Sequence, residues 1–283
     1  MSWKEAVATA LSKLLRPGIR ANLLAAALSM PLRLIAPRRR VAMKNLEIAL
    51  PRASRSERRR ILKGTYEHLV RTGIEFTMLQ RDPRLALEWV DAENSSLLDS
   101  LDGRGAILLT GHVGNWELVA AWLAQRRYKV TAIVQETDDH GMIERMRSRV
   151  GVRSMPKSVP MIRAAAVLRR GEFLGILPDQ HGGASGIPVM FFGLETSTSP
   201  GAAVFAYLTK KPLVPIFSRR ISASPCKHLL RVGDPIEWSP CGNRDATIAD
   251  ITGRINREVE RMVLEAPDQW LAQHRRFKEY YGR

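Results

Sequence analysis

The segment Ala106–Glu117, which reads AILLTGHVGNWE, decides the fold of this chain. Its first part, Ala106–Leu109, is a short apolar run that ends at turn residues, and such a run predicts a buried strand. Asn115 is a favourable N-cap, so a helix is expected to begin directly after it. A strand that leads through a tight turn into a helix is the building unit of α/β sheets, whose ligands bind at the carboxyl edge of the strands.

Strand and helix patterns alternate on the C-terminal side of this segment. Further strands are predicted at Val130–Val134, Phe173–Leu177, Leu213–Phe217 and Leu229–Val232. Helices are predicted at Glu117–Arg126, Gly141–Val150 and Met161–Arg169, with a closing helix at Ala246–Leu264 that Pro267 follows. This order is typical of an α/β fold with a central, mostly parallel or mixed sheet and helices on both faces.

The part that precedes the sheet reads as helical. The apolar positions of 41–50 stop at Pro51, and Ser54 followed by Glu57 forms a capping-box pattern that opens a helix over 57–79. We therefore divide the chain into an N-terminal region, 1–37, and one domain, 38–283. Within that domain a helical lead-in covers 38–100, and the α/β core begins at about residue 105.

The N-terminal region combines apolar and basic residues. The stretch Ala21–Leu32 is uncharged but contains Pro31 and is only 12 residues long, whereas about 20 are needed to span a bilayer. An apolar stripe at helical spacing precedes it within 3–15, and three consecutive arginines follow at 38–40. The pattern favours a pair of short helices that lie in a membrane interface. The alternative is a helical hairpin packed on the protein's own core.

Charge is concentrated in the same part of the chain. The 283 residues carry a net charge of +16, of which 15 basic and three acidic residues within 1–63 contribute +12. A basic region of this kind binds phosphate, either on nucleic acid or on an anionic bilayer. The aromatic content of 6% and the lack of a nucleic-acid-binding motif argue against nucleic acid. The two cysteines exclude a disulfide scaffold and a four-thiolate zinc site.

The candidate chemistry centres on His112 and Glu117. Residues five apart do not share a face of a regular helix, so the two can meet only if His112 lies in the preceding loop, which Gly111 and Gly114 permit. A histidine oriented by a carboxylate is a general-base arrangement, and amides around Gly114 and at the helix N-terminus are candidate oxyanion donors. The alternative is a histidine in a turn beside a glutamate that merely starts a helix. Asp179 follows a strand at the same sheet edge and is expected either to border the site or to be a turn residue.

The segment Gly111–Glu117, GHVGNWE, resembles the His-x4-Asp/Glu block of the glycerolipid acyltransferase superfamily, and more narrowly that of the late lipid A acyltransferases. Other segments resemble blocks of that family in the same order. They are the Arg-x-x-x-x-Asn-Leu of 40–46, the arginine-containing block 147–151, the Pro-Asp-Gln block within 175–180, the loop 191–193, Val214-Pro215, and the closing Trp-x-x-x-His-x-Arg-x-Lys of 270–278.

The resemblance implies transfer of a fatty acyl chain from an acyl-carrier-protein or coenzyme A thioester to a hydroxyl of a lipid A precursor. It implies an enzyme held peripherally or monotopically on the cytoplasmic side of the cell inner membrane, whose partners are an anionic bilayer, an acidic carrier protein and a phosphorylated glycolipid. No metal, no further cofactor and no nucleic acid are expected. The implied catalytic residues are His112 and Glu117, and the implied substrate-binding residues are Gly114, Asn115, Arg147, which would hold a phosphate, Asp179 and Gln180.

Two departures from the family pattern bear on the substrate. Pro178-Asp179-Gln180 stands where the superfamily has its phosphate-binding Phe-Pro-Glu-Gly-Thr-Arg, which argues against glycerol 3-phosphate as acceptor. The segment 135–139 stands where the family often has Tyr-Arg-Pro, so the exact acceptor stays open. A related group of enzymes acylates mannosylated phosphoinositides, which are the alternative acceptors. A thioesterase is a further alternative, because His112 and Glu117 could activate water. No Gly-x-Ser-x-Gly elbow supports a covalent route for that reaction.

Overall fold

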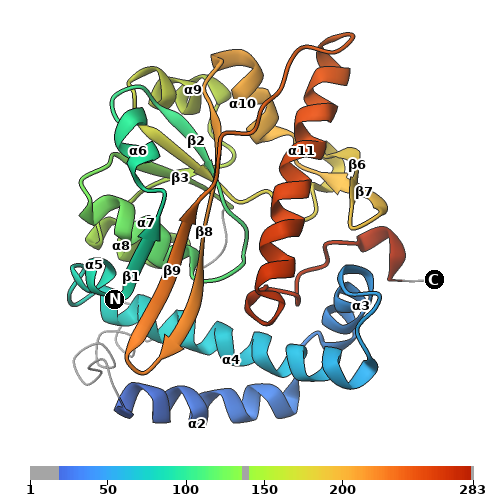
Figure 1. Ribbon diagram of the computed structural model, residues 1–283. Helices are drawn as coiled ribbons and strands as arrows, with labels where there is room; N and C mark the ends of the chain where they lie inside the picture. The colour runs from blue at the N-terminus through green and yellow to red at the C-terminus, as the bar shows by residue number, and fades with distance from the viewer. Residues whose placement is uncertain (1–18, 136–139, 282–283) are drawn as a thin grey trace.

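The computed structural model describes residues 19–135 and 140–281. Seven strands form one sheet in the order β1-β9-β8-β2-β5-β3-β4 (Figure 1). All neighbours are parallel except the hairpin pair β8 and β9. The predicted mixed, mostly parallel sheet is therefore confirmed. Its strands are β1 (Val90–Glu93), β2 (Ala106–Leu109), β3 (Val130–Val134), β4 (Arg153–Pro156), β5 (Phe173–Ile176), β8 (Leu213–Ala223) and β9 (Cys226–Val232).

Both faces of the sheet are covered, as the alternation along β2 shows. Ala106 and Leu108 belong to an apolar cluster with α5 (Leu85–Trp89), α6 (Ser96–Leu101) and α7 (Trp116–Gln125). Ile107 and Leu109 belong to a second cluster with α9 (Met161–Arg169), α10 (Gly201–Thr209) and α11 (Arg244–Glu265). Successive side chains of a strand point to opposite faces, so the fully apolar β2 marks the centre of the sandwich.

Four helices in the described part of the chain precede the sheet: α2 (Ile19–Ile35), α3 (Arg39–Ala49), α4 (Arg55–Leu79) and the short α5. Helix α4 runs beneath the ends of β8 and β9, and α2 lies antiparallel along it (Figure 1). The predicted cap is confirmed, because the Ser54 hydroxyl accepts a hydrogen bond from the Glu57 amide at 3.2 Å. The predicted stripe within 3–15 lies outside the described residues.

Helix α2 has one packed face and one exposed face. Ala25 and Ser29 are fully buried against the rest of the protein, in agreement with the packed-hairpin alternative. Leu23, Met30 and Leu34 are 65%, 62% and 75% exposed and recur at helical spacing on the other face. No helix in the described part of the chain combines the length and the apolar character needed to cross a bilayer.

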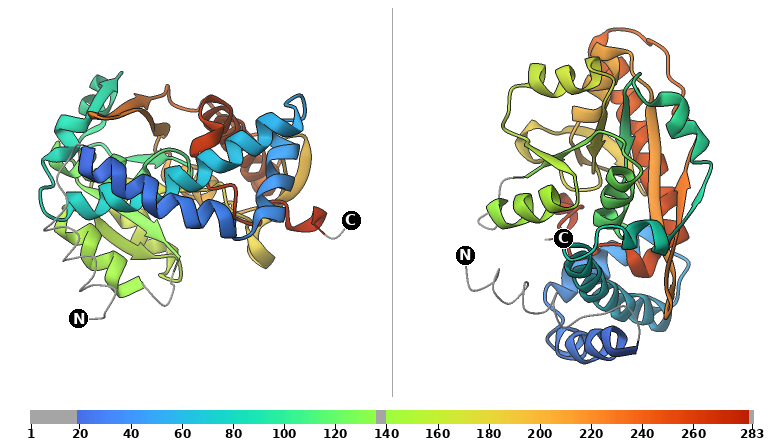
Figure 2. Two further views of the ribbon diagram at one scale, coloured as in Figure 1. Left: turned by 90° about the horizontal axis from the view of Figure 1, so that it is seen from below. Right: turned by 90° about the vertical axis from the view of Figure 1, so that its left-hand side faces the viewer.

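Several elements were not predicted, for reasons visible in their composition. The edge strands β1 and β4 are polar, and of the four residues of β1 only Val90 is buried. The hairpin of β6 (Ile187–Phe191) and β7 (Leu194–Thr198) stands apart from the main sheet and has mixed burial. Helix α8 (His140–Arg149) was predicted to within one residue of its observed bounds. In the right-hand view of Figure 2, α8 and α9 lie opposite the β8–β9 hairpin.

Candidate active site

The loop between β2 and α7 is a tight turn built around Gly114. The Gly114 φ angle is +63°, and a Cβ atom built there would lie 1.5 Å from the Ser218 carbonyl oxygen, so only glycine fits. Asn115 then caps α7, because its Oδ1 atom accepts a hydrogen bond from the Leu118 amide at 2.9 Å. The turn places His112 in the loop ahead of the helix, as predicted from its spacing to Glu117.

His112 is held by Asp179, which follows the neighbouring strand β5. The His112 Nδ1 atom lies 2.8 Å from Asp179 Oδ1, and the His112 amide donates to Asp179 Oδ2 at 2.9 Å. Burial alone would raise the pKa of Asp179, but the charge of His112 and these two hydrogen bonds lower it on balance. A carboxylate can only accept, so Nδ1 carries a hydrogen, and in the neutral tautomer that this contact selects the lone pair is on Nε2.

The predicted pairing of His112 with Glu117 is wrong. No hydrogen bond joins these two residues, both of which lie in the described part of the chain. Glu117 instead accepts from Arg147, with Nε at 3.0 Å and Nη2 at 2.6 Å, and from Trp116 Nε1 at 3.2 Å. The reason is topological: Glu117 lies in the first turn of α7 beside α8, whereas Asp179 follows β5, the strand next to β2.

Arg147 therefore lies in the site with its charge compensated. The side chains of Arg147 and Glu117 are 16% and 10% exposed, so this is a largely buried bidentate pair. Burial would lower the pKa of Arg147, but its bonds to Glu117 raise it on balance. Arg147 still lines the cavity beside His112, and its role toward an acceptor phosphate stays a prediction.

Gly114 and Asn115, both predicted to bind substrate, belong to the part of the loop that faces away from the cavity. The Gly114 amide donates to the Gln269 carbonyl at 3.0 Å, so it is not free to act as the predicted oxyanion donor. Asn115 is fully buried, and neither residue lines the cavity. Gln180 does line it, and its Nε2 atom lies 3.4 Å from His112 Nε2.

A cavity of about 590 Å³ opens beside His112. Its polar lining residues include Arg147 and Gln180, and Trp116 packs edge-on against the His112 imidazole with ring centroids 5.0 Å apart. The rest of the wall is mainly apolar, with contributions from Ala132, Ile133, Val134, Ile143, Met155, Val159, Met161, Ala164, Ile176, Leu177 and Phe205. An imidazole that presents an Nε2 lone pair to a mainly apolar cavity can take a proton from a hydroxyl group bound there.

The C-terminal segment closes the site from behind. The Leu271 amide donates to the His112 carbonyl at 2.8 Å. Arg276 is fully buried, and its guanidinium donates to the Ser197 carbonyl and the Thr198 hydroxyl, each at 2.7 Å. Its charge also helps to lower the pKa of Asp179. The sequence marked this segment only as a family-like signature, and nothing local in it indicated contact with His112.

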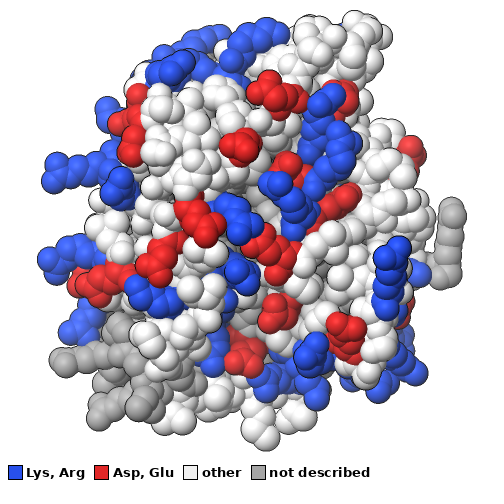
Figure 3. Space-filling model, viewed as in Figure 1, with Lys and Arg blue, Asp and Glu red and all other residues white. Residues whose placement is uncertain are grey.

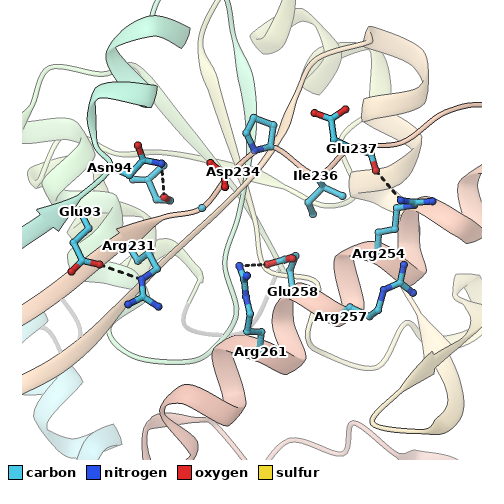
Figure 4. A pocket seen from close by; sticks show the side chains of 13 residues that line it. Glu93, Asn94, Arg231, Asp234, Ile236, Glu237, Arg254, Arg257, Glu258 and Arg261 are labelled. Carbon is cyan, nitrogen blue, oxygen red and sulfur yellow. Dashed lines mark hydrogen bonds and ion pairs between the residues drawn. The ribbon is translucent and has the colours of Figure 1, made fainter.

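A second hollow of about 650 Å³ lies between the end of β9 and α11 (Figure 4). Its charges are largely paired, with Glu93 3.2 Å from Arg231 and Glu258 2.5 Å from Arg261. Blue and red side chains accordingly alternate across this face in Figure 3. The described residues that line it include no histidine, cysteine, serine or threonine, so it offers no nucleophile with an adjacent imidazole base.

Among the described residues, one group of potential metal ligands lies behind the loop between β2 and α7. Ligand atoms of Glu75, Cys226 and His228 lie within 4.8 Å of one another. Both Glu75 oxygens already bind the guanidinium of Arg220, at 2.9 and 2.8 Å. A divalent cation at this point would face that buried positive charge, so the donor set does not fit a metal.

Known proteins resemble this chain over much of its length. Residues 6–279 match the family described as bacterial lipid A biosynthesis acyltransferase. The chain is 27% identical over 261 residues to the lipid A biosynthesis lauroyltransferase of Escherichia coli (strain K12), covering 87% of this chain and 81% of that protein. It is 24% identical over 256 residues to the palmitoleoyltransferase of the same strain, covering 85% and 79%. It is also 28% identical over 130 residues to a phosphatidylinositol mannoside acyltransferase of Mycobacterium tuberculosis (strain ATCC 25618 / H37Rv), covering 42% and 41%.

The chain belongs to the bacterial lipid A biosynthesis acyltransferase family, because the family match spans nearly all of it. The prediction of an acyltransferase made from the sequence blocks is thereby confirmed at the level of the family.

Proposed function

We propose that this chain transfers a fatty acyl group from a thioester, carried by an acyl carrier protein or by coenzyme A, to a hydroxyl of a lipid A precursor. The observation that carries the proposal is the arrangement of His112. Its Nδ1 atom is fixed 2.8 Å from Asp179, while its ring lines a cavity of about 590 Å³ with mainly apolar walls.

The reaction needs one base and no covalent enzyme intermediate. His112 Nε2 takes the proton of the acceptor hydroxyl as its oxygen attacks the thioester carbonyl carbon. Asp179 stabilises the imidazolium that forms. The carbon–sulfur bond then breaks, and the departing thiolate receives the proton from Nε2. Helix α7 begins at Trp116, which lines the cavity beside His112. The positive end of its helix dipole favours the oxyanion that forms on the thioester carbonyl.

The apolar part of the cavity would hold the acyl chain. Apolar walls favour a methylene chain by about 0.8 kcal/mol for each buried CH₂ group. Ala164 of α9 lines this part and is only 3% exposed, so Ala164→Phe should fill cavity space and shift the preference toward shorter chains. Competition between thioesters of different chain length measures that preference.

The acceptor and donor are tested together by mass spectrometry. Purified protein is incubated with mixed acyl thioesters and either a lipid A precursor or a mannosylated phosphoinositide, and products are weighed. A mass increase of one acyl group on the lipid A precursor supports the proposal. Acylation of the phosphoinositide alone would favour the second acceptor, which the partial similarity to the mycobacterial enzyme suggests. Release of free fatty acid alone would indicate a thioesterase.

The exposed face of α2 is the proposed membrane contact, on the cytoplasmic side of the inner membrane. Leu23, Met30 and Leu34 would enter the interface, and the arginines at 38–40 would meet anionic headgroups. Vesicle co-sedimentation across a salt series separates the apolar contribution to membrane binding from the electrostatic contribution, because salt weakens only the electrostatic one. Leu34→Glu should release the protein, while Leu264→Glu, at a 53% exposed position on α11, serves as the matched control. Release by salt or nuclease alone would point to a purely electrostatic contact or to nucleic acid.

A further inference from the structure

A second set of ionisable side chains, largely sealed from solvent, lies behind the loop that carries His112. This loop, residues 110–115, is called the catalytic loop below. Glu75 of α4 and Arg220 of β8 form a bidentate pair, with Nε and Nη2 of Arg220 at 2.9 and 2.8 Å from the carboxylate oxygens. The two side chains are only 9% and 8% exposed. Burial alone would raise the pKa of Glu75, but Arg220 and His228 hold it well below its usual range. A buried carboxylate that stays ionised in this way depends on its partner, and the reverse also holds.

His68 extends this pair toward the loop. Burial lowers the pKa of His68 to about 3, with the charge of Arg220 adding to the effect, so the ring is neutral. The Arg220 Nη1 atom lies 2.6 Å from His68 Nδ1, and a guanidinium can only donate. Nδ1 therefore accepts, and the hydrogen sits on Nε2, which donates to the Gly114 carbonyl at 2.9 Å.

Two further connections reach the same loop. The Asn115 Nδ2 atom donates to Glu75 Oε2 at 2.8 Å, which fixes the residue that caps α7. The Gln269 side chain bonds the backbone of Arg220 at 2.8 and 3.0 Å, and the Gln269 carbonyl accepts from the Gly114 amide at 3.0 Å. Gly114 and Asn115 are thus held from three directions, and His112 is two residues away.

We propose that Glu75, together with Arg220, is a positioning residue that fixes the loop carrying His112, so that the imidazole meets Asp179 and the cavity in one geometry. This inference rests on the proposed acyl transfer, in which His112 is the base. Glu75 neither lines the cavity nor bonds His112; it acts through its bond to Asn115 and through Arg220, which bonds His68 and Gln269. Because misplacement of a reacting group by about 1 Å can cost on the order of 100-fold in rate, small loop shifts should be visible in catalysis.

The test variant is Glu75→Gln, which keeps the size of the side chain and removes its charge. We expect kcat to fall about 10- to 100-fold while KM for donor and acceptor stays within about twofold, because the binding walls are untouched. The second readout is the His112 Nδ1 proton in histidine-labelled protein, observed by nuclear magnetic resonance without substrate. Its signal should shift or broaden in Glu75→Gln.

Glu172→Gln is the matched control. Glu172 is 7% exposed and pairs with Arg170 at 3.3 Å and with Arg153, so it is another buried carboxylate held by arginine. It lies at the start of β5, and no hydrogen bond of its side chain reaches the catalytic loop. We expect lower stability from this variant, with kcat and the His112 signal as in the wild type.

The double variant Glu75→Leu/Arg220→Met covers the case in which Glu75→Gln does not fold, because removing both charges of a buried pair is often tolerated. It should also lose kcat and show a changed His112 signal. A folded Glu75 variant with wild-type kcat and an unchanged His112 signal would overturn the proposal. If the wild type itself transfers no acyl group, the proposed function fails, while the resonance comparison still decides whether Glu75 fixes the loop.

Discussion

Two sets of histidine and carboxylate side chains lie on opposite sides of one loop, and they differ in what the histidine can reach. On the cavity side, His112 has one nitrogen on Asp179 and the other toward the cavity. On the sealed side, His68 has Nδ1 on Arg220 and Nε2 on the Gly114 carbonyl, and it is only 6% exposed. The residue types are alike, but only His112 turns a ring nitrogen toward the cavity, where Nε2 makes a long contact of 3.4 Å with the Gln180 amide.

The difference shows what decides whether a histidine paired in this way can transfer a proton or only holds the structure together. A histidine whose two nitrogens are both engaged and whose burial keeps it neutral cannot exchange protons with a ligand, and it serves as a fixed hydrogen-bond link. A histidine oriented at one nitrogen and open at the other is a general base. In the proposed reaction the sealed set holds the loop in place, and the cavity set carries out the transfer.

The strongest test of the comparison is His112→Ala. Because this removes the proposed base, kcat should fall about 10²- to 10⁴-fold with the thermal unfolding midpoint little changed. The measurement is acyl transfer under saturating donor and acceptor. Near-normal turnover in a folded His112→Ala protein would mean that the cavity-side histidine is not the base.

The next test separates the two carboxylates near His112. Asp179→Asn should lower kcat about 100-fold or more, because an amide that donates to Nδ1 would stabilise the wrong tautomer. Glu117→Gln should cost less, since Glu117 bonds Arg147 and Trp116 rather than the histidine. Rates measured side by side decide the matter, and a larger loss in Glu117→Gln would restore the pairing first expected from the sequence.

The sealed set makes a prediction about stability against pH. His68 has a folded-state pKa of about 3, whereas an unfolded histidine titrates near 6.5. Between these values the unfolded chain binds a proton that the folded chain does not. The free energy of unfolding should therefore fall as pH drops below about 6.5, by up to about 1.4 kcal/mol per pH unit. The contribution of ionised Glu75 to the free energy of unfolding is lost at lower pH, as the pH falls below the pKa of about 4.3 that a glutamate has in the unfolded chain.

Urea unfolding at a series of pH values from 7 to 4 measures this slope. His68→Gln can keep both hydrogen bonds, because its amide accepts through oxygen and donates through nitrogen, so the slope should shrink by about 1 kcal/mol per pH unit. A residual slope is expected from His274, whose pKa burial lowers to about 4. An identical slope in His68→Gln and wild type would contradict the sealed, neutral histidine.

The smallest expected effect concerns Arg147→Lys on the cavity side. An ammonium cannot reproduce the bidentate contact with Glu117, so the cavity wall should loosen. We expect KM for the acceptor to rise about fivefold, which corresponds to about 1 kcal/mol, with KM for the donor nearly unchanged. Equal KM values for the acceptor in both proteins would leave Arg147 with a purely structural role beside Glu117.

Much of the fold could be predicted because it depends on local pattern. The strands Ala106–Leu109 and Val130–Val134 and the helix Met161–Arg169 were predicted with the bounds observed. The polar strands β1 and β4 were missed, because at a sheet edge pairing does not require an apolar pattern. For the site, His112 was predicted to lie in a loop before its helix, and it does. Its partner was predicted wrongly, because Asp179 is 67 residues away and reaches His112 only through the pairing of β2 with β5.

The sequence by itself determined the alternation of strands and helices, the cap at Asn115 and the family of the chain. These properties arise from contacts between residues a few positions apart, or from blocks that can be read in order. Only the tertiary structure decided which carboxylate orients His112, that Arg147 is paired, and that Glu75, His68 and Arg220 meet behind the loop. Such pairings join segments 30 to 152 residues apart, and their energies depend on burial and distance, which local sequence does not encode.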